Sequence, residues 1–464
     1  MSLTELSASL RSAEISPREA VQNYLERIGK YDSDINSYIT VLGDEALAEA
    51  DSIGRYRPED RGPLWGVPVA IKDVIDVEGV VTTCGSYTTL EASPAVRDAA
   101  TVEGLRRAGA IILGKLNTHE FAYGAMTTSP RFGPGRNPWS LDRIVGGSSG
   151  GSGASVAARL AAGTLGTDTA GSVRIPAAFN GVTGLRPTTG RVSNRGVFPV
   201  SYTFDSVGPL ASSAEDCARL LGAIAGYDPE DASTVDVSVP DYLEELGKGI
   251  SGMRIGVVRS LFDGEIDTRI AEMTLSGIAQ LKALGAKVSD ISIPDIEHFG
   301  TIQQAMQFSD ATEVHEKTLR SDLDAYGPDV RARLLTGLYV PSSVYAAGQR
   351  ARRIAYETMR KVFQGVDLLC APTMPVLPPL IGEDTVECNG KTMLYRLTVI
   401  PYNSPWSLVG LPVLSLPCGF VDQMPVGMAL IGWRFSEADI FRAGYAYQKE
   451  TQWHMQEPSL TVNE

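Results

Sequence analysis

The sequence predicts an α/β protein, because short apolar strands alternate with helical patterns along the chain. Two strand–helix–strand units carry this prediction, one over residues 66–114 and the other over residues 254–293. In each unit an apolar run precedes a segment with helical periodicity, and a second apolar run follows it. This order is typical of a sheet whose strands are joined by helices that cover its faces.

The individual elements follow from periodicity and end signals. The segment Ser16-Pro17-Arg18-Glu19 has the pattern of a capping box with proline at the first helical position, so a helix begins there. Segments 124–153 and 164–193 are rich in Gly, Ser, Thr and Pro and are expected to be mainly loop. The other expected elements are strands at 37–41, 66–73, 110–114, 164–168, 254–258, 286–293, 366–372, 412–419 and 425–432, and helices at 44–54, 98–108, 152–163, 214–225, 266–284, 300–365 and 437–451.

Composition is that of a globular chain with a large core. Hydrophobic residues make up 43% and charged residues 21% of the 464 residues, which argues against disorder. No apolar run approaches about 18 residues, and no signal peptide is recognised at the N-terminus, so we expect no membrane association. With no flexible linker or internal repeat, a single domain over residues 1–464 is expected.

Net charge and the spacing of the cysteines limit the kinds of partner, metal site and cellular compartment that we expect. The chain has 41 basic and 55 acidic residues, a net charge of −14, which disfavours nucleic acid as a partner. The five cysteines are far apart and form no metal-ligand spacing, so neither a disulfide framework nor a metal site is indicated. A cytoplasmic location is the simplest setting for these thiols. We expect a small neutral molecule as substrate, with self-association into a homo-oligomer left open.

The glycine-rich loop at 146–155, GGSSGGSGAS, is the most unusual segment of the sequence. Such a loop before a helix can hold a phosphate, but neither GxGxxG nor GxxxxGK[ST] is present. The same residues fit a loose G-x-S-x-G nucleophile elbow, which would require a histidine later in the chain. His298, His315 and His454 are available, and none lies in a marked loop.

Three candidate catalytic residues are considered together. They are Lys72 at the end of an apolar strand, Ser148 in the glycine loop and Ser172 in GTDTAGSVR. With the segments GVPVAIKD, GGSSGGSGASVAA, GTDTAGSVRIPAAFNGVTGLRPT and SVGPLASS, the sequence resembles the amidase signature family. The resemblance is dense over about residues 60–215 and looser elsewhere. It implies one domain with a large mixed, twisted sheet between layers of helices.

The resemblance also implies a Ser–cis-Ser–Lys triad, with Ser172 as nucleophile, Ser148 as the cis-serine after Gly147, and Lys72 as base. The chemistry is physically reasonable. A serine hydroxyl needs a base to become a good nucleophile. Burial of Lys72 would favour its neutral form, so that Ser148 could pass a proton from Ser172 to the amine and return it to the leaving group.

Further residues are assigned from the same resemblance. The backbone N–H groups of the run Thr169, Ala170, Gly171 and Ser172 are expected to form the oxyanion hole, with Ala170 where many relatives have glycine. Structural roles near the site are expected for Gly147, Ser149, Asp168 and Arg174. Substrate contacts are expected from Ala122, Tyr123, Gly124 and Ile400.

The identity of the substrate is expected to depend on the variable region at about 230–400. Glutamine-hydrolysing members of the family carry an acidic residue at the position of Ile400, and residues 391–410 contain no Asp or Glu. Aromatic residues in that segment suggest an apolar or aromatic substrate. The sequence therefore favours a stand-alone hydrolase of aryl or alkyl amides, with carbamate (urethane) and ester cleavage possible and no cofactor. The alternatives are a glutaminase subunit of a tRNA-dependent amidotransferase and a His-dependent serine esterase.

Overall fold

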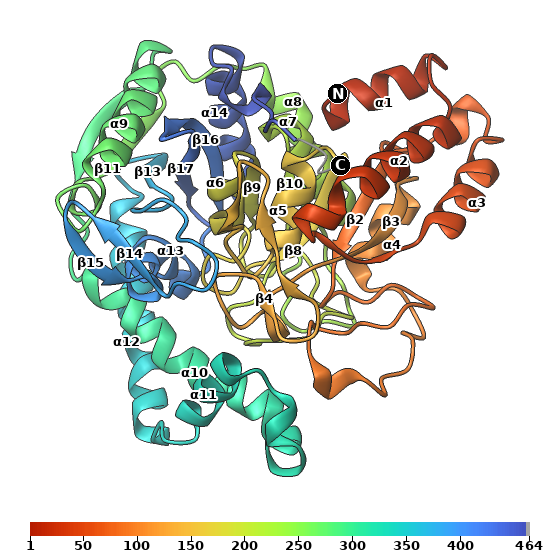
Figure 1. Ribbon diagram of the computed structural model, residues 1–464. Coiled ribbons are helices and arrows are strands. Elements are labelled where there is room, and N and C mark those ends of the chain that lie inside the picture. The colour runs from red at the N-terminus through yellow and green to blue at the C-terminus, as the bar shows by residue number, and fades with distance from the viewer. Residues whose placement is uncertain (461–464) are drawn as a thin grey trace.

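Eleven strands form one mixed β-sheet through the centre of the computed structural model, which describes residues 1–460 (Figure 1). The strands, in spatial order, are β1 (Tyr38–Val41), β3 (Ile111–Leu116), β2 (Pro68–Lys72), β8 (Gly163–Thr167), β10 (Val207–Ala211), β9 (Thr183–Arg186), β16 (Val413–Val421), β17 (Met424–Gly432), β13 (Leu368–Pro372), β11 (Arg254–Val258) and β12 (Lys287–Ile291).

The two predicted strand–helix–strand units are the parallel parts of this sheet. Strand β2 runs parallel to β3 and β8, and β11 runs parallel to β12 and β13, whereas the other neighbours are antiparallel. Strands β2, β3, β8 and β13 are buried along their whole length, as continuous apolar runs require. The α/β class and the large mixed sheet are therefore confirmed.

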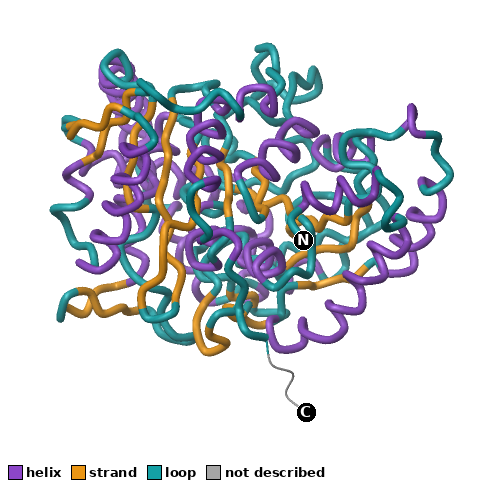
Figure 2. The backbone as a smooth tube through the Cα atoms, turned by 90° about the horizontal axis from the view of Figure 1, so that it is seen from above, coloured by secondary structure: helices purple, strands orange, loops and turns teal. Residues whose placement is uncertain are grey.

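Helices lie on both sides of the strands (Figures 1 and 2). They are α1 (Leu3–Arg11), α2 (Pro17–Ile35), α3 (Gly43–Ile53), α4 (Ala100–Arg107), α5 (Gly150–Ala157), α6 (Arg174–Asn180), α7 (Ala214–Ile224), α8 (Tyr242–Leu246), α9 (Thr268–Ala283), α10 (Ile296–Ser321), α11 (Pro328–Gly337), α12 (Ser342–Val362), α13 (Tyr395–Val409) and α14 (Glu437–Lys449). Helix α2 begins with the predicted capping box, because Ser16 accepts from the Glu19 N–H while the Glu19 carboxylate accepts from Ser16.

Several elements differ from the sequence-based expectation. The segment predicted as loop at 164–193 contains α6 and β9, and 124–153 contains the short strands β4 (Thr128–Ser129), β5 (Gly133–Pro134), β6 (Arg136–Asn137) and β7 (Ser140–Ile144). The hairpin β14 (Thr385–Cys388) and β15 (Lys391–Leu394) was not expected either. Helix α13 was missed because Pro401 and Pro405 lie inside it, and proline removes a backbone donor that a helix normally uses.

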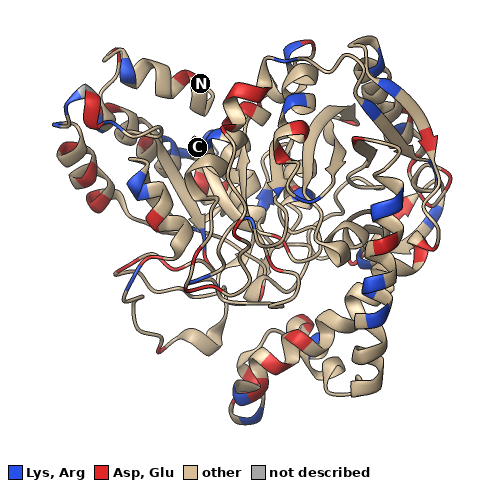
Figure 3. Cartoon of the chain, turned by 180° about the vertical axis from the view of Figure 1, so that it is seen from behind, with Lys and Arg blue, Asp and Glu red and all other residues tan. Residues whose placement is uncertain are grey.

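The helices α10, α11 and α12 extend away from the sheet at one end of the molecule (Figure 1). Viewed from behind, charged side chains lie mostly on the outer helices and loops rather than on the central strands (Figure 3). Within residues 1–460, none of the helices combines the length and the apolar character that crossing a bilayer would require.

Strands β2 and β3 are joined at their ends by a fully buried ion pair. The Lys115 ammonium lies 2.8 Å from the Asp73 carboxylate, and both side chains are 0% exposed. Lys115 also donates to the Thr82 hydroxyl at 3.0 Å, and Asp73 accepts from the backbone N–H of Thr83 at 3.1 Å. The pair holds the end of β2, where Lys72 lies, against β3.

Replacing Lys115 by methionine leaves the buried Asp73 carboxylate without its counter-charge. We expect a loss of about 3–5 kcal/mol in the free energy of unfolding, because a buried charge that loses its partner is strongly destabilising. Urea denaturation at neutral pH measures this loss. Lys282→Met, at an exposed position of α9, is the matched control, and equal stability of the two variants would contradict the assignment.

Candidate active site

The ammonium group of Lys72 lies at the buried end of β2. Because β2 and β8 are parallel neighbours, their carboxyl ends share one edge of the sheet, and Lys72 meets Thr167 there. Lys72 Nζ is 2.7 Å from Ser148 Oγ and 2.7 Å from Thr167 Oγ1. Burial lowers the pKa of Lys72 to about 7, against the opposing influence of the Asp168 and Asp205 carboxylates. A neutral amine at this position is therefore accessible near neutral pH.

Ser148 is the last residue but one before helix α5, and the peptide bond between Gly147 and Ser148 is cis. A Cβ on residue 147 would come within 2.6 Å of the Met126 backbone nitrogen, so glycine is required by close approach. The Ser148 carbonyl accepts from the His119 N–H at 3.1 Å and from the Thr118 hydroxyl at 3.1 Å. These contacts fix the backbone that points the Ser148 hydroxyl at Lys72.

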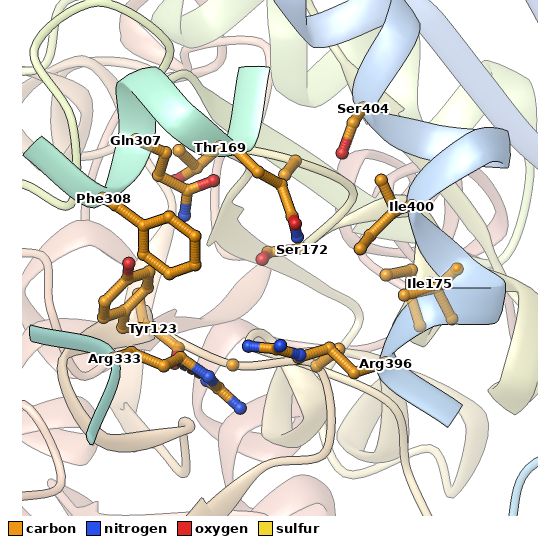
Figure 4. A pocket seen from close by; sticks show the side chains of 16 residues that line it. Tyr123, Thr169, Ser172, Ile175, Gln307, Phe308, Arg333, Arg396, Ile400 and Ser404 are labelled. Carbon is orange, nitrogen blue, oxygen red and sulfur yellow. Dashed lines mark hydrogen bonds between the residues drawn. The ribbon is translucent and has the colours of Figure 1, made fainter. Parts of the chain in front are cut away.

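Ser149 and Ser172 join the glycine loop to the turn after β8. The Ser149 N–H donates to the Ser172 carbonyl at 3.1 Å, and the Ser149 hydroxyl donates to the Thr167 carbonyl at 3.1 Å. Ser172 is partly exposed and lines the cavity (Figure 4), whereas Ser148 is buried. The structure thus places Lys72 against Ser148, and the backbone bond from Ser149 links the glycine loop to Ser172.

Asp168 organises the turn that carries Ser172. Its carboxylate accepts from the backbone N–H groups of Gly171 at 2.8 Å and Val173 at 3.1 Å, and from both Nε and Nη2 of Arg174 at 2.9 and 2.8 Å. Burial alone would raise the pKa of Asp168, but Arg174 and Arg186 outweigh it and hold that pKa well below its usual range. Asp168 is therefore a permanent anion that shapes the loop.

Arg174 also ties this turn to helix α13. It donates to the Asn403 carbonyl at 2.9 Å and to the Ser407 hydroxyl at 2.9 Å. The structure therefore places Asp168 and Arg174 where they support the loop and not where they would contact a reacting group.

The structure changes one residue of the predicted oxyanion hole, Gly171. The Gly171 N–H is already donated to Asp168, so this amide is not free to bind an oxyanion. Within residues 1–460, the N–H groups of Thr169, Ala170 and Ser172 have no protein acceptor. Gly171 has φ of +125°, and a Cβ there would lie 2.8 Å from Cβ of Asn403, so its contribution is to the shape of the turn. Ala170 is not among the described residues with a positive φ.

The cavity above Ser172 is built from three parts of the chain. Residues from the 122–125 segment, from the turn after β8, and from helices α10, α11 and α13 line it: Ala122, Tyr123, Gly124, Ala125, Thr169, Ala170, Ser172, Ile175, Gln304, Gln307, Phe308, Arg333, Arg396, Val399, Ile400 and Ser404. The four residues predicted to contact substrate, Ala122, Tyr123, Gly124 and Ile400, are among them.

The lining is less aromatic and more polar than the sequence suggested. Tyr395, Tyr402 and Trp406 are buried in the core, where each donates to a backbone carbonyl and none lines the cavity. Two arginines, Arg333 and Arg396, line it instead. They lie in the variable region, and sequence reasoning missed them, as it missed Thr167, because nothing in their local sequence distinguishes them from surface residues.

The histidines do not form a catalytic dyad with Ser172. None of the four is among the residues that line the cavity within the described part of the chain. His298 is exposed, and the buried His315 lies 2.9 Å from the Tyr326 hydroxyl. His119 is buried beside the site and its Nε2 lies 3.0 Å from Asp329. The arrangement therefore gives no support to a His-dependent esterase.

Curated relatives match almost the full chain. A glutamyl-tRNA(Gln) amidotransferase subunit from Halorhodospira halophila is 39% identical over 481 residues, covering 98% of both chains. This relative belongs, by its name, to an enzyme that acts with a tRNA. The finding overturns the prediction that the partners are limited to a small neutral substrate and further copies of the chain, with nucleic acid excluded. The error arose because net charge describes the whole surface and says nothing about a local contact.

Solved structures and a family model agree on the fold. A structure described as a vestigial protein complex, from work on the origins of an s-triazine catabolic enzyme, has a TM-score of 0.93 and 35% identity, covering 99% of this chain and 100% of that one. A bacterial aryl acylamidase of the amidase signature family has a TM-score of 0.89 and 26% identity, covering 98% of each chain. The Amidase family model matches residues 19–441. The chain belongs to the amidase signature family of hydrolases that act on carbon–nitrogen bonds.

Proposed function

We propose that this chain hydrolyses amides through an acyl-enzyme formed on Ser172, with Ser148 as proton relay and Lys72 as base. The observation that carries the proposal is the distance of 2.7 Å between Lys72 Nζ and Ser148 Oγ, both buried, next to Ser149, whose N–H donates to the carbonyl of the cavity-lining Ser172.

In the first half-reaction, neutral Lys72 accepts the Ser148 proton while Ser148 accepts the proton of Ser172. Ser172 Oγ then bonds to the amide carbon, and the carbonyl oxygen becomes an oxyanion. We expect the N–H groups of Thr169, Ala170 and Ser172, which have no protein acceptor within residues 1–460, to donate to that oxygen. When the tetrahedral intermediate collapses, the proton returns through Ser148 to the leaving nitrogen.

In the second half-reaction, a water molecule occupies the position that the leaving amine of the substrate has vacated. Lys72 and Ser148 accept its proton as its oxygen attacks the ester carbon, and Ser172 regains a proton when the acid leaves. Carbamates and esters are cleaved by the same acyl-enzyme chemistry, and their use by this protein remains a prediction.

A second candidate function is favoured by the curated relatives: glutamine hydrolysis in a complex that works with partner chains and a tRNA. The identity of 39% over nearly the whole chain supports it. Ile400 stands against it, because Ile400 lines the cavity and no Asp or Glu is among the lining residues to bind the α-ammonium group of glutamine.

Removing the Ser172 hydroxyl should abolish acylation. We expect Ser172→Ala, Ser148→Ala and Lys72→Ala each to lower kcat by at least about a thousandfold without loss of the fold, since members of a catalytic unit act together. Hydrolysis of an amide panel and intact-mass detection of an acyl adduct measure this. Ser343→Ala, at an exposed position of α12, is the control. Normal turnover by Ser172→Ala would refute the nucleophile assignment.

The pH dependence of kcat/KM should follow the titration of the Lys72 amine. Because the pKa of Lys72 is lowered to about 7 and the neutral form is active, kcat/KM should rise with pH through about 7 and level off above it. The Asp205 carboxylate raises the pKa of Lys72, so Asp205→Asn should move this limb to lower pH. Asp290→Asn, at an exposed position of β12, should leave it unchanged. A limb that stays in place in Asp205→Asn would contradict the assignment of Lys72.

Ile400 offers a test between the two candidate functions. If the wild-type cavity lacks an ammonium site, Ile400→Asp should raise kcat/KM for L-glutamine by about tenfold, because it supplies a counter-charge. Ile400→Asn, of the same shape without the charge, is the matched control. Efficient ammonia release from L-glutamine by the wild type, with no gain in Ile400→Asp, would instead establish the glutaminase.

A further inference from the structure

Two arginines line the cavity: Arg333, which is partly exposed, and Arg396, which is exposed to solvent. Arg333 projects from α11 and Arg396 from the first turn of α13, and Figure 4 shows their head groups pointing toward one another beneath Ser172. Neither residue belongs to the triad or to its supporting hydrogen bonds. Like charges repel each other, and an anion bound between them would offset that repulsion.

Arg333 is held in place by protein groups. Its Nη2 lies 2.7 Å from Asp329 Oδ1, and its Nη1 donates to the Tyr123 carbonyl. Asp329 is itself 3.0 Å from Nε2 of the buried His119, and Nδ1 of that ring lies 3.4 Å from the Thr128 N–H. A ring that accepts at Nδ1 donates from Nε2 to Asp329, so His119 is neutral here. Asp329 therefore balances the charge of Arg333.

The positive charge of Arg396 has no neighbouring carboxylate to compensate it within residues 1–460. Within residues 1–460, no carboxylate lies within 4.0 Å of its guanidinium group, and no hydrogen bond to another residue engages it. Burial and the charge of Arg396 both lower the pKa of Arg333, which shows that the two cations act on each other. With Arg333 paired to Asp329, one positive charge of the cavity lining is left without a partner: that of Arg396, which is exposed to solvent and lies one turn before the apolar Val399 and Ile400 on the same helix.

We propose that the substrate is an amide that carries one carboxylate and no ammonium group, and that Arg396 binds this carboxylate beside the fixed Arg333. The inference rests on the proposed function, because it names the substrate class of the same site. It replaces the neutral substrate predicted from the sequence. Within residues 1–460, no Asp or Glu lines the cavity, and the apolar side chain of Ile400 offers no counter-charge to an ammonium group.

Three amides of nearly equal size test the proposal. Glutaramate carries a carboxylate at the far end, glutaramide carries an uncharged amide there, and L-glutamine adds an α-ammonium group to glutaramate. We expect kcat/KM to be about 10- to 100-fold higher for glutaramate than for either of the others, the range that corresponds to a charged hydrogen bond. Ammonia release from each substrate by the wild-type protein measures this.

Substitution of Arg396 then tests whether this residue causes the preference for glutaramate. Arg396→Gln should lower kcat/KM for glutaramate by about 10- to 100-fold, mainly through KM, and should change kcat/KM for glutaramide by much less. Arg350→Gln, at an exposed position of α12, is the matched control.

These experiments distinguish failure of the proposed substrate class from failure of the proposed amide hydrolysis. Equal use of glutaramate and glutaramide by the wild type, or equal loss of both in Arg396→Gln, overturns the substrate class while amide hydrolysis stands. Faster use of L-glutamine than of glutaramate overturns the exclusion of an ammonium group. Failure with all three, while another amide of the panel forms an acyl adduct on Ser172, overturns the substrate class alone. Failure with the whole panel, with no acyl adduct on Ser172, removes the proposed function itself.

Discussion

The burial of one lysine at the end of a central strand is the constraint on which the rest of the site depends. An amine in water is protonated at neutral pH, and it becomes a base here because Lys72 is 0% exposed and has hydroxyl groups of Ser148 and Thr167 for neighbours. That burial requires a strand covered on both faces, and the wide mixed sheet supplies one. The fold and the chemistry are therefore linked through the solvation of a single nitrogen atom.

A second buried charge, Asp168, keeps the nucleophile in place. Its carboxylate is shared among two backbone amides and two arginines, so the turn that carries Ser172 is bonded to the strand before it and, through Arg174, to helix α13. A buried anion with this many donors stays ionised. The same bond engages the Gly171 N–H, so in the proposed mechanism the neighbouring amides are the ones left to stabilise a developing charge.

Much of the catalytic end of the cavity could be predicted because its residues lie within one stretch of sequence. Lys72, Ser148 and Ser172 lie at the ends of strands or in glycine-rich turns, and the resemblance of these segments to the amidase signature family assigned their proposed roles. The opposite wall could not be predicted in this way. Arg333 and Arg396 lie on helices 63 positions apart in the numbering, and helix α13 was hidden by its two prolines. Their meeting depends on how α11 and α13 pack, which no local pattern records.

The amino-acid sequence by itself determined the α/β class and most strands of the sheet, all but β9 and β10, since periodicity and strand ends are local properties. The residues proposed as the acylating group came from the resemblance of its glycine-rich segments to the amidase signature family. The tertiary structure alone decided the solvation of Lys72, the pairing of Arg333 with Asp329 and the uncompensated charge of Arg396. The physical reason is that electrostatic energies depend on burial and on distance in space. Both are set by contacts between segments far apart in the chain.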